Sequence, residues 1–591
     1  MVFPSIANVP EAFSSRPQRS VALRCLLLNS ELAFSRLIQE SGDTAALRLY
    51  DELRGYRVLA NKQMEKMQTA ANTDSLRAIV DSLNAQADVA EKALLEKSKV
   101  YGDYTHNLVI TWPQVQAQLG EKDVAVEFVS FPYEVDSTMY VAYVLRKDGQ
   151  PQMIPLFEEK TLTALSRKDK DGFDYGYCES DAVSRMVWVP LAELLRGTEN
   201  VYFAASGELH NIPVEALPDW ERAGHFMNEK YKFHRLSSTR ELALIKDHND
   251  WHDAAVYGGL LYGAEKKDFE AHHDRYAVKK RDFDFGTALS DDSFLGYNIA
   301  DSIAVVRAED KLPQYLEGTM KEAVDITMSL KMAKVDATLY SDSLGTEASF
   351  KDLSGQRMNV MHIGTHGFFA SKRQTAQRSD NSLLDGMLAG NRTAHYTEDY
   401  ALTRSGLLFA GANFALSGNA LPEGVENGIL TANEISALDL RGLDLVVLSA
   451  CQTGLGEVSG EGVFGLQRGF KKAGAQTLVM SLWKVDDTAT QLFMTRFFQN
   501  LSGLKMDKYA AFTEAQDYLR HYETTVTVSP SDAPAKSPTA ADRLKPKGQR
   551  EEEAKKSAEQ SATTAQPETR TVRPFDTPKY WSSFILLDAA E

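Results

Sequence analysis

The chain has 591 residues, 43% of them hydrophobic and 25% charged, which is enough for two to four domains with buried cores. Its 82 acidic and 65 basic residues leave a net charge of −17, which argues against general binding to a phosphate backbone, so we expect no direct nucleic-acid contact. Cys25, Cys178 and Cys451 are too few and too scattered for a disulfide scaffold or a cysteine-based metal site.

No apolar run approaches the roughly 20 residues that a membrane-spanning helix needs. The first twenty residues lack the basic start and continuous apolar stretch of a secretory signal. We therefore expect a protein of the reducing cytoplasm that does not enter a membrane.

Residues 1–115 are predicted to form a helical spacer or short bundle. Between Leu76 and Leu94, apolar residues recur at the i, i+3, i+4, i+7 spacing of one buried helix face. A 34-residue helical repeat is not found in this region. Helices of this kind usually provide packing and partner surface.

The chain after residue 115 is predicted to be α/β. Short apolar runs in residues 116–250 indicate strands at 124–130, 139–145 and 201–205. In residues 251–591, apolar runs that end near residues 259, 363, 450 and 483 alternate with predicted helices. Continuous apolar strands that alternate with helices are typical of a mostly parallel sheet with helices on both faces.

One segment breaks this pattern before the chain ends. Residues 525–574 are rich in Ser, Thr, Ala, Pro, Lys and Glu and are nearly devoid of large apolar residues, so they are predicted to be a disordered surface insertion. The run 580–587, YWSSFILL, then predicts one more buried strand that completes the sheet.

Two strand ends carry reactive side chains. NVMHI is followed by His366 between Gly364 and Gly367, and LDLVVLSA is followed directly by Cys451. Ligands bind an open parallel sheet at the carboxyl ends of its strands, so the two loops are predicted to face each other across a cleft. Taken singly, each residue has a structural explanation, because a lone histidine or cysteine beside a strand is usually part of the core. Together they suggest a nucleophile and its base.

The amino-acid sequence around these residues resembles that of the CHAT domain, a caspase-like module of the separase, metacaspase and caspase group of cysteine peptidases. The resemblance rests on VMHIGTHGFF and on the long run that starts at VVLSACQTGLGE, together with SGELHNIPVEAL, LPQYLEGTMKEA, RSGLLFAGA, NGILTANEI and PKYWSSFILL. It implies a caspase-like fold in which 116–250 is a non-catalytic half and 251–591 the catalytic half. The family commonly carries tetratricopeptide repeats upstream, and this chain keeps only the helical spacer.

The resemblance implies a cysteine endopeptidase with Cys451 as nucleophile and His366 as base and acid. Gly367 and Cys451 would supply the backbone N–H groups that bind the oxyanion. Relatives that cut after Arg or Lys have a carboxylate in the first pocket, so Asp486 or Asp487, with Trp483 as a wall, is a candidate pocket. The alternative for one of the two acids is that it caps the helix that follows, a role expected of Asp487.

The sequence leaves a second function open, a non-catalytic interaction scaffold that keeps the peptidase fold. No cofactor and no catalytic metal are predicted, since the spacing of His210 and Glu215 fits no standard ligand set and His362 lies inside a strand. His210 and Cys178 are interpreted as structural. The expected partners are a protein substrate and a regulatory protein or a tetratricopeptide-repeat partner.

Overall fold

The computed structural model describes residues 110–134, 137–244, 250–278, 312–369, 405–450, 457–459, 462–528 and 568–589, with Leu402 and scattered residues between 45 and 93. The scattered residues are helical, as predicted for this part of the chain. Most of the predicted spacer and the central part of the predicted insertion lie outside the described residues.

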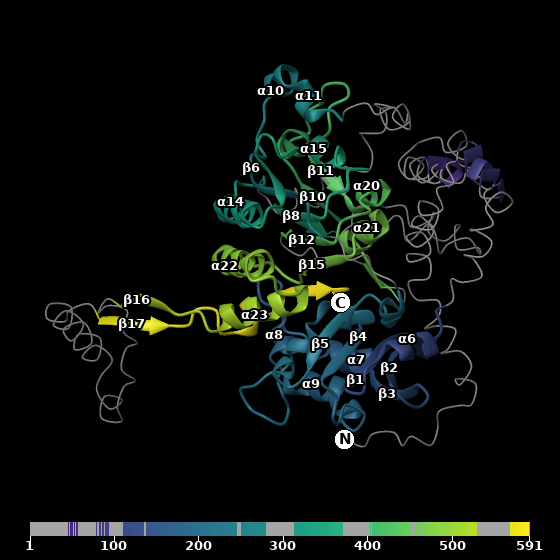
Figure 1. Ribbon diagram of the computed structural model, residues 1–591. Coiled ribbons are helices and arrows are strands. Elements are labelled where there is room, and N and C mark those ends of the chain that lie inside the picture. Colours follow the sequence, from purple (N-terminus) through teal and green to yellow (C-terminus); the bar gives the residue numbers. More distant parts are fainter. Residues whose placement is uncertain are drawn as a thin grey trace, which may run out of the picture.

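A single mixed sheet of eleven strands runs through the described part of the chain, in the spatial order β3-β2-β1-β4-β5-β18-β15-β12-β8-β6-β7 (Figure 1). The strands are β1 (Asp123–Glu134), β2 (Ser137–Arg146), β3 (Gln152–Glu158), β4 (Asn200–Ala204), β5 (Lys232–Leu236), β6 (Asp253–Leu260), β7 (Asp336–Asp342), β8 (Val360–Gly364), β12 (Leu445–Ser449), β15 (Thr477–Ser481) and β18 (Phe584–Leu587). The predicted strand runs are all present.

The sheet consists of two halves joined by the last strand of the chain. The N-terminal half is β3-β2-β1-β4-β5, in which β1, β4 and β5 are parallel and β2 and β3 are antiparallel additions. The C-terminal half is β15-β12-β8-β6-β7, and all its pairs are parallel. Between them, β18 is antiparallel to β15 and parallel to β5. The two halves therefore run in opposite directions, and their carboxyl ends lie at opposite edges of the sheet.

Helices cover both faces of the sheet, as predicted (Figure 1). One face of the C-terminal half packs against α14 (Glu317–Met332), α22 (Asp487–Phe498), α23 (Lys508–Arg520) and α25 (Pro578–Trp581). The other face of this half contacts α15 (Glu347–Lys351), α19 (Ala412–Leu416), α20 (Ala432–Ala437) and α21 (Leu466–Ala473). In the N-terminal half, α9 (Asp181–Trp188) packs on β1, β4 and β5 through Trp188. Shorter helices are α7 (Glu159–Thr163), α8 (Tyr175–Cys178), α10 (Lys266–Ala271), α11 (His273–Tyr276) and the 3₁₀ turn η4 (Gly207–Asn211).

Burial on both faces explains the continuous apolar runs. In β12, Leu445 and Val447 belong to the core under α14 and α22, whereas Val446 and Leu448 belong to the core on the opposite face. Because successive side chains of a strand point to opposite faces, a strand covered on both sides needs apolar residues at every position. The fold class expected from the sequence is thus confirmed.

Smaller sheets extend from the central one. β9 (Gly367–Phe369), β10 (Ser405–Leu408) and β11 (Ile429–Thr431) form an antiparallel sheet in the order β11-β10-β9, and β13 (Glu457–Ser459) pairs with β14 (Gly462–Phe464). A two-stranded ribbon of β16 (Thr524–Val528) and β17 (Glu568–Val572) projects from the body (Figure 1). The predicted disordered insertion at 525–574 therefore has strand pairing at both ends, because β-branched threonines and valines favour extended backbone there.

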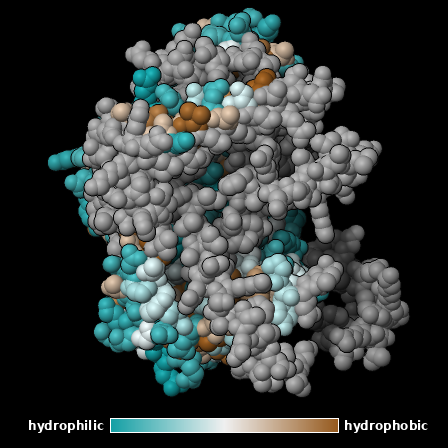
Figure 2. Space-filling view, turned by 90° about the vertical axis from the view of Figure 1, so that its right-hand side faces the viewer, coloured by the Kyte–Doolittle hydropathy of each residue, from teal (hydrophilic) through white to brown (hydrophobic). Residues whose placement is uncertain are grey.

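The predicted boundary at residue 115 falls inside a helix. α6 (Trp112–Gln118) packs Val115 and Leu119 against Ala125 of β1 and Leu145 of β2. This helix therefore belongs to the N-terminal half of the sheet, which it covers on one face. On the side of the molecule shown in Figure 2, hydrophobic residues appear in small groups among hydrophilic ones.

Candidate active site

β8 and β12 are neighbouring parallel strands, and their ends are level. Gly364 pairs with Ser449 in their register. His366 follows Gly364 by two residues, and Cys451 follows Ser449 by two residues. Cys451 itself lies outside the described residues. The Ser481 hydroxyl of β15 donates to the carbonyl of Ala450 at 2.6 Å, which holds the residue before Cys451 against the next strand.

His366 is half-buried, and its ring is held by a backbone carbonyl. Nε2 lies 2.8 Å from the carbonyl oxygen of Gln314. A carbonyl oxygen can only accept a hydrogen bond, so the proton of the neutral ring is on Nε2 and Nδ1 is the nitrogen that can take up a proton. In this structure the Gln314 carbonyl orients the ring.

The loop that carries Gln314 is fixed by contacts at both ends. The Asn413 side-chain amide donates to the carbonyl of Pro313 at 3.0 Å. At the start of α14, the Thr319 hydroxyl donates to the Leu316 carbonyl at 2.8 Å and accepts from the backbone N–H of Gly259 at 3.0 Å. These bonds hold the loop over the ends of the strands.

Gly364 permits α14 to approach β8 closely. A Cβ at this position would lie 3.1 Å from the Cβ of Thr319, closer than nearly all such contacts. Any side chain here would push the start of α14 away from β8, and the Gln314 carbonyl with it. The close packing of α14 on β8 therefore explains why a glycine stands two residues before His366.

Tyr262, two residues after the end of β6, packs against the ring of His366. The ring centroids of Tyr262 and His366 are 4.9 Å apart. The Tyr262 hydroxyl lies 2.9 Å from Oγ1 of Thr365, and the Thr365 hydroxyl in turn donates to the Leu408 carbonyl. Burial raises the pKa of Tyr262 to about 12, so the hydroxyl keeps its proton at neutral pH. The sequence analysis did not identify this residue, because a tyrosine after a strand has no distinctive pattern.

The backbone N–H of Gly367 points away from the small sheet. Gly367 pairs with Leu407, and the Leu408 N–H donates to the His366 carbonyl at 2.9 Å. Alternate residues of an antiparallel strand direct their backbone groups to opposite sides. Since the His366 carbonyl faces β10, the Gly367 N–H is directed to the other side of β9, which is the edge strand of this sheet among the described residues.

The three residues of the predicted substrate pocket have different positions. Asp486 is exposed and caps α22, where its Oδ1 accepts from the Ala489 N–H at 2.9 Å. Asp487 is also exposed, and its Cβ would lie 3.4 Å from a Cβ added to Gly318 at the start of α14. The helix cap expected at Asp487 is therefore corrected: the capping residue is Asp486, and Asp487 is the first residue of the helix.

Trp483 is only 2% exposed and does not line an open surface. Its ring packs edge-on against Phe173 of the N-terminal half, with centroids 4.9 Å apart, and its Nε1 donates to the Lys579 carbonyl at 2.9 Å. The prediction of Trp483 as a pocket wall is corrected on this point. The indole is large and apolar, and it packs between the two halves of the sheet.

Other titratable groups belong to the core. Cys178 is buried, which raises the pKa of its thiol well above the usual value. His362, inside β8, lies 2.7 Å from Glu322 of α14, and both are buried. Among the described residues, one group of carboxylates is close enough to share a metal ion, namely Glu347, Glu426 and Glu434. The Lys351 ammonium lies within 3.0 Å of all three and takes the place of a cation.

The profile of the CHAT domain family matches residues 179–589. Among curated proteins, tetratricopeptide repeat protein 28 of Mus musculus is 42% identical over 79 residues, or 13% of this chain and 3% of that protein. The same protein of Homo sapiens is 40% identical over 88 residues, or 15% and 3%. This chain thus spans only a small part of these relatives.

Among solved structures, a crystal structure of the Saccharomyces cerevisiae separase–securin complex has a TM-score of 0.32 and 10% identity, covering 76% of this chain and 33% of that one. Among the described residues, no helix is both long and apolar enough to cross a membrane.

Proposed function

Because the chain belongs to the CHAT domain family, we propose that it is a cysteine endopeptidase in which Cys451 attacks the peptide and His366 transfers the protons. One observation carries the proposal. The strands that precede the two residues are neighbours and parallel, with Gly364 opposite Ser449, so each residue follows the same level of the sheet by two positions.

In the first step, the Cys451 thiol gives its proton to Nδ1 of His366, and the thiolate attacks the carbonyl carbon of the scissile bond. A free thiol has a pKa of about 8.5, so a neighbouring imidazolium is needed to populate the thiolate at neutral pH. The Gln314 carbonyl supports this step, because it accepts a hydrogen bond from the proton-bearing Nε2 of His366 and so leaves Nδ1 as the basic nitrogen of the ring. The oxyanion is bound by the N–H groups of Gly367 and Cys451, each worth about 3–4 kcal/mol.

In the second step, the C–N bond breaks as Nδ1 of His366 protonates the leaving amine. The product is a thioester between Cys451 and the N-terminal part of the substrate. Water then attacks the thioester carbonyl while His366 takes its proton. The C–S bond breaks, the substrate part leaves with a new carboxyl group, and the proton on His366 restores the Cys451 thiol. No external reductant or oxidant is needed.

Asp487 is our candidate for recognition of a basic residue before the scissile bond. It is exposed at the start of α22, which follows β15, and β15 lies beside β12 on the side away from β8. Asp486 is a weaker candidate, because one of its carboxylate oxygens is already used by the helix cap. The buried Trp483 is not part of this pocket.

We also propose that a regulatory protein or a tetratricopeptide-repeat partner controls the activity. Its support is the local similarity to two tetratricopeptide repeat proteins, together with the predicted helical spacer ahead of the sheet. An endopeptidase in a reducing cytoplasm needs such control, since its substrates are the proteins around it.

The test compares wild type with Cys451→Ala by identifying new protein N-termini in a treated proteome. We expect cleavage products with wild type and none with Cys451→Ala, at nearly the same thermal stability. Cys25→Ala, which removes a thiol without a proposed role, should cleave like wild type. The same N-termini from Cys451→Ala as from wild type would refute the proposal. If Cys451→Ala loses its fold together with its cleavage, Cys451 is a core residue, as expected of a non-catalytic scaffold.

A further inference from the structure

The carboxyl ends of β12, β8, β6 and β7 lie side by side in this order. Cys451 follows β12 and His366 follows β8, and the two remaining strands continue the edge beyond the histidine. β6 and β7 end level with each other, because Leu260 pairs with Asp342. Both extend past the end of β8, since Tyr257 of β6 already pairs with Ile363 of β8. The edge therefore continues past the proposed catalytic pair. We call the surface of Leu261, Tyr315 and Leu344 at this edge the shelf.

This shelf lies on the side of the leaving group. The general acid has to reach the leaving amine, so the part of the substrate that follows the scissile bond lies toward His366. Neighbouring strands are about 4.8 Å apart, which puts the end of β6 about 5 Å and the end of β7 about 10 Å from β8. An extended peptide advances about 3.4 Å per residue, so the second and third residues after the bond reach these two ends.

Three large apolar side chains are exposed on the shelf. Leu261 follows β6 and is 43% exposed, Leu344 follows β7 and is 53% exposed, and Tyr315 lies in the loop of Gln314 and is 41% exposed. The Leu261 N–H donates to the Asp342 carbonyl at 3.1 Å, and the Leu344 N–H donates to the Ser341 carbonyl at 2.9 Å. These bonds hold Leu261 and Leu344 on adjacent turns of the same edge.

Acidic side chains border the same apolar residues. Asp342 and Glu317 are exposed. Asp342 ends β7 two residues before Leu344, and Glu317 starts α14 two residues after Tyr315. Consistent with this placement, the pKa of Tyr315 is raised by partial burial and then by the negative charges of Asp342 and Glu317. An apolar surface bordered by carboxylates suits a segment with an apolar side chain next to a basic one.

We propose that Leu261, Tyr315 and Leu344 form a subsite for an apolar side chain two or three residues after the scissile bond, and that Asp342 and Glu317 select a neighbouring Lys or Arg. The subsite rests on the proposed endopeptidase function and adds a substrate class to it. Asp487 approaches Gly318, the neighbour of Glu317, so the test of this subsite relies on Leu261, Leu344 and Asp342.

The test uses the full chain and a proteome-derived peptide library, in which the sequences on both sides of every cut are determined. We expect wild-type cuts to be enriched in large apolar residues and in Lys or Arg within three residues after the bond. Leu261→Ser and Leu344→Ser should each reduce the apolar enrichment about fivefold, as expected when about 40 Å² of apolar contact is lost. Asp342→Asn should reduce the enrichment of Lys and Arg about twofold to threefold, because it removes one exposed negative charge. Asparagine is chosen because it tolerates the φ of 52° at this position.

Met332→Ser is the matched control. Met332 is 86% exposed at the end of α14, close to the amino end of β7 and thus far from the shelf, so its replacement should leave the cleavage pattern unchanged. Cleavage without any preference after the bond, or an enrichment that persists in Leu261→Ser and Leu344→Ser, would overturn the subsite alone. If wild type cuts nothing in the library, the endopeptidase function fails, and the subsite fails with it.

Discussion

The two halves of the sheet are built from similar apolar strands but differ in what lies beyond the strand ends. In the N-terminal half, polar groups there are used internally. Ser206, after β4, accepts from the Ser130 N–H at 2.9 Å, and the Thr239 N–H, after β5, donates to the buried carboxylate of Glu127 at 2.8 Å. In the C-terminal half, the half-buried His366, after β8, has its Nε2 2.8 Å from the carbonyl oxygen of Gln314 in a separate loop.

This difference shows how one sheet supports both stability and a site. The halves run in opposite directions, so the carboxyl edge of the N-terminal half lies at the amino edge of the C-terminal half. Buried hydrogen bonds at the first edge stabilise the sheet, and the second edge carries the residues of the proposed site. Four substitutions test this comparison.

The largest effect is expected for His366→Ala in the C-terminal half. Loss of the general acid and base should reduce cleavage about 10²-fold to 10⁴-fold, and alkylation of Cys451 at neutral pH should slow as the thiolate population falls. His225→Ala is the control, because His225 is an exposed histidine of the N-terminal half. Initial rates of cleavage and of alkylation measure both. A rate unchanged in His366→Ala would place the chemistry elsewhere.

Asp588→Ala should destabilise the joint between the halves. The buried carboxylate of Asp588, directly after β18, accepts from the Ser237 N–H at 2.7 Å and pairs with the Lys471 ammonium at 2.8 Å. Removal of one partner leaves a buried charge, so we expect a loss of about 3–5 kcal/mol in the free energy of unfolding. Urea denaturation measures the loss.

Asp588→Asn is the matched variant for this joint. Asparagine keeps an acceptor for Ser237 and tolerates the φ of 61° at this position, so it should lose less stability than alanine. Should Asp588→Ala unfold within about 1 kcal/mol of wild type, the two halves do not depend on this contact.

Tyr262→Phe should have a smaller effect on the reaction. The ring that packs on His366 remains, but the hydroxyl contact to Thr365 is lost, so we expect cleavage to fall about threefold to tenfold. We regard Tyr262 as a residue that positions His366, so the pH profile of Cys451 alkylation should shift in Tyr262→Phe. Tyr143→Phe removes a hydroxyl from the N-terminal half and should leave this profile unaltered. The same profile in both variants would argue against positioning by Tyr262.

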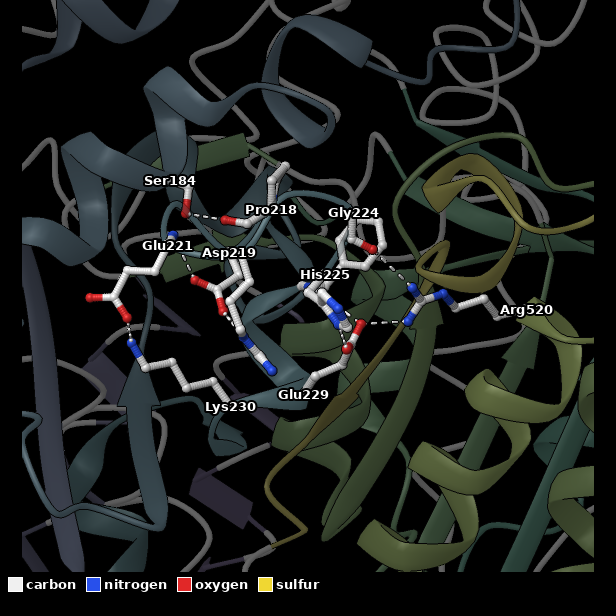
Figure 3. Close-up of polar contacts among 11 residues, drawn as sticks. Ser184, Pro218, Asp219, Glu221, Gly224, His225, Glu229, Lys230 and Arg520 are labelled. Carbon is white, nitrogen blue, oxygen red and sulfur yellow. Dashed lines mark hydrogen bonds and ion pairs between the residues drawn. The ribbon is translucent and has the colours of Figure 1, made fainter.

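The smallest effect is expected at the exposed contact between the halves in Figure 3. Glu229 pairs there with His225 and with Arg520 of α23. Partial burial raises the pKa of Glu229, but the bonds from His225 and Arg520 outweigh it and hold the pKa below its usual value of 4.5. The stabilisation is therefore present above pH 4.5 and is lost as the pH falls through the lowered pKa.

Glu229→Gln should remove this acid-side dependence and cost less than about 1 kcal/mol at neutral pH, because the pair is partly exposed. Thermal unfolding between pH 3 and pH 7 checks both expectations. Equal pH dependence in wild type and variant would mean that the pair contributes nothing to stability.

Much of the fold followed from local pattern, and the reason is burial. β8, β12, β15 and β18 are apolar at nearly every position because both of their faces are covered, and such runs are visible in the sequence. The last strand was predicted for the same reason, although an insertion separates it from the rest. The ribbon of β16 and β17 was missed, since its exposed strands carry no core pattern.

The surroundings of the proposed site were harder to predict. The Gln314 carbonyl is a backbone group that every residue has, so no residue type marks it. Trp483 was expected at a pocket, but its large apolar surface lies in the contact with Phe173 of the other half. Both positions depend on loops that meet only after the two halves have joined.

The amino-acid sequence by itself determined the apolar strands, the helices between them, and the placement of His366 and Cys451 directly after two of those strands. These features depend on the period of side chains along one segment, which local sequence encodes. Only the tertiary structure decided that β8 and β12 are neighbours, that the two halves run in opposite directions, and that the Gln314 carbonyl orients the histidine. Such relations are contacts between distant segments, and packing free energy selects them for the whole molecule at once.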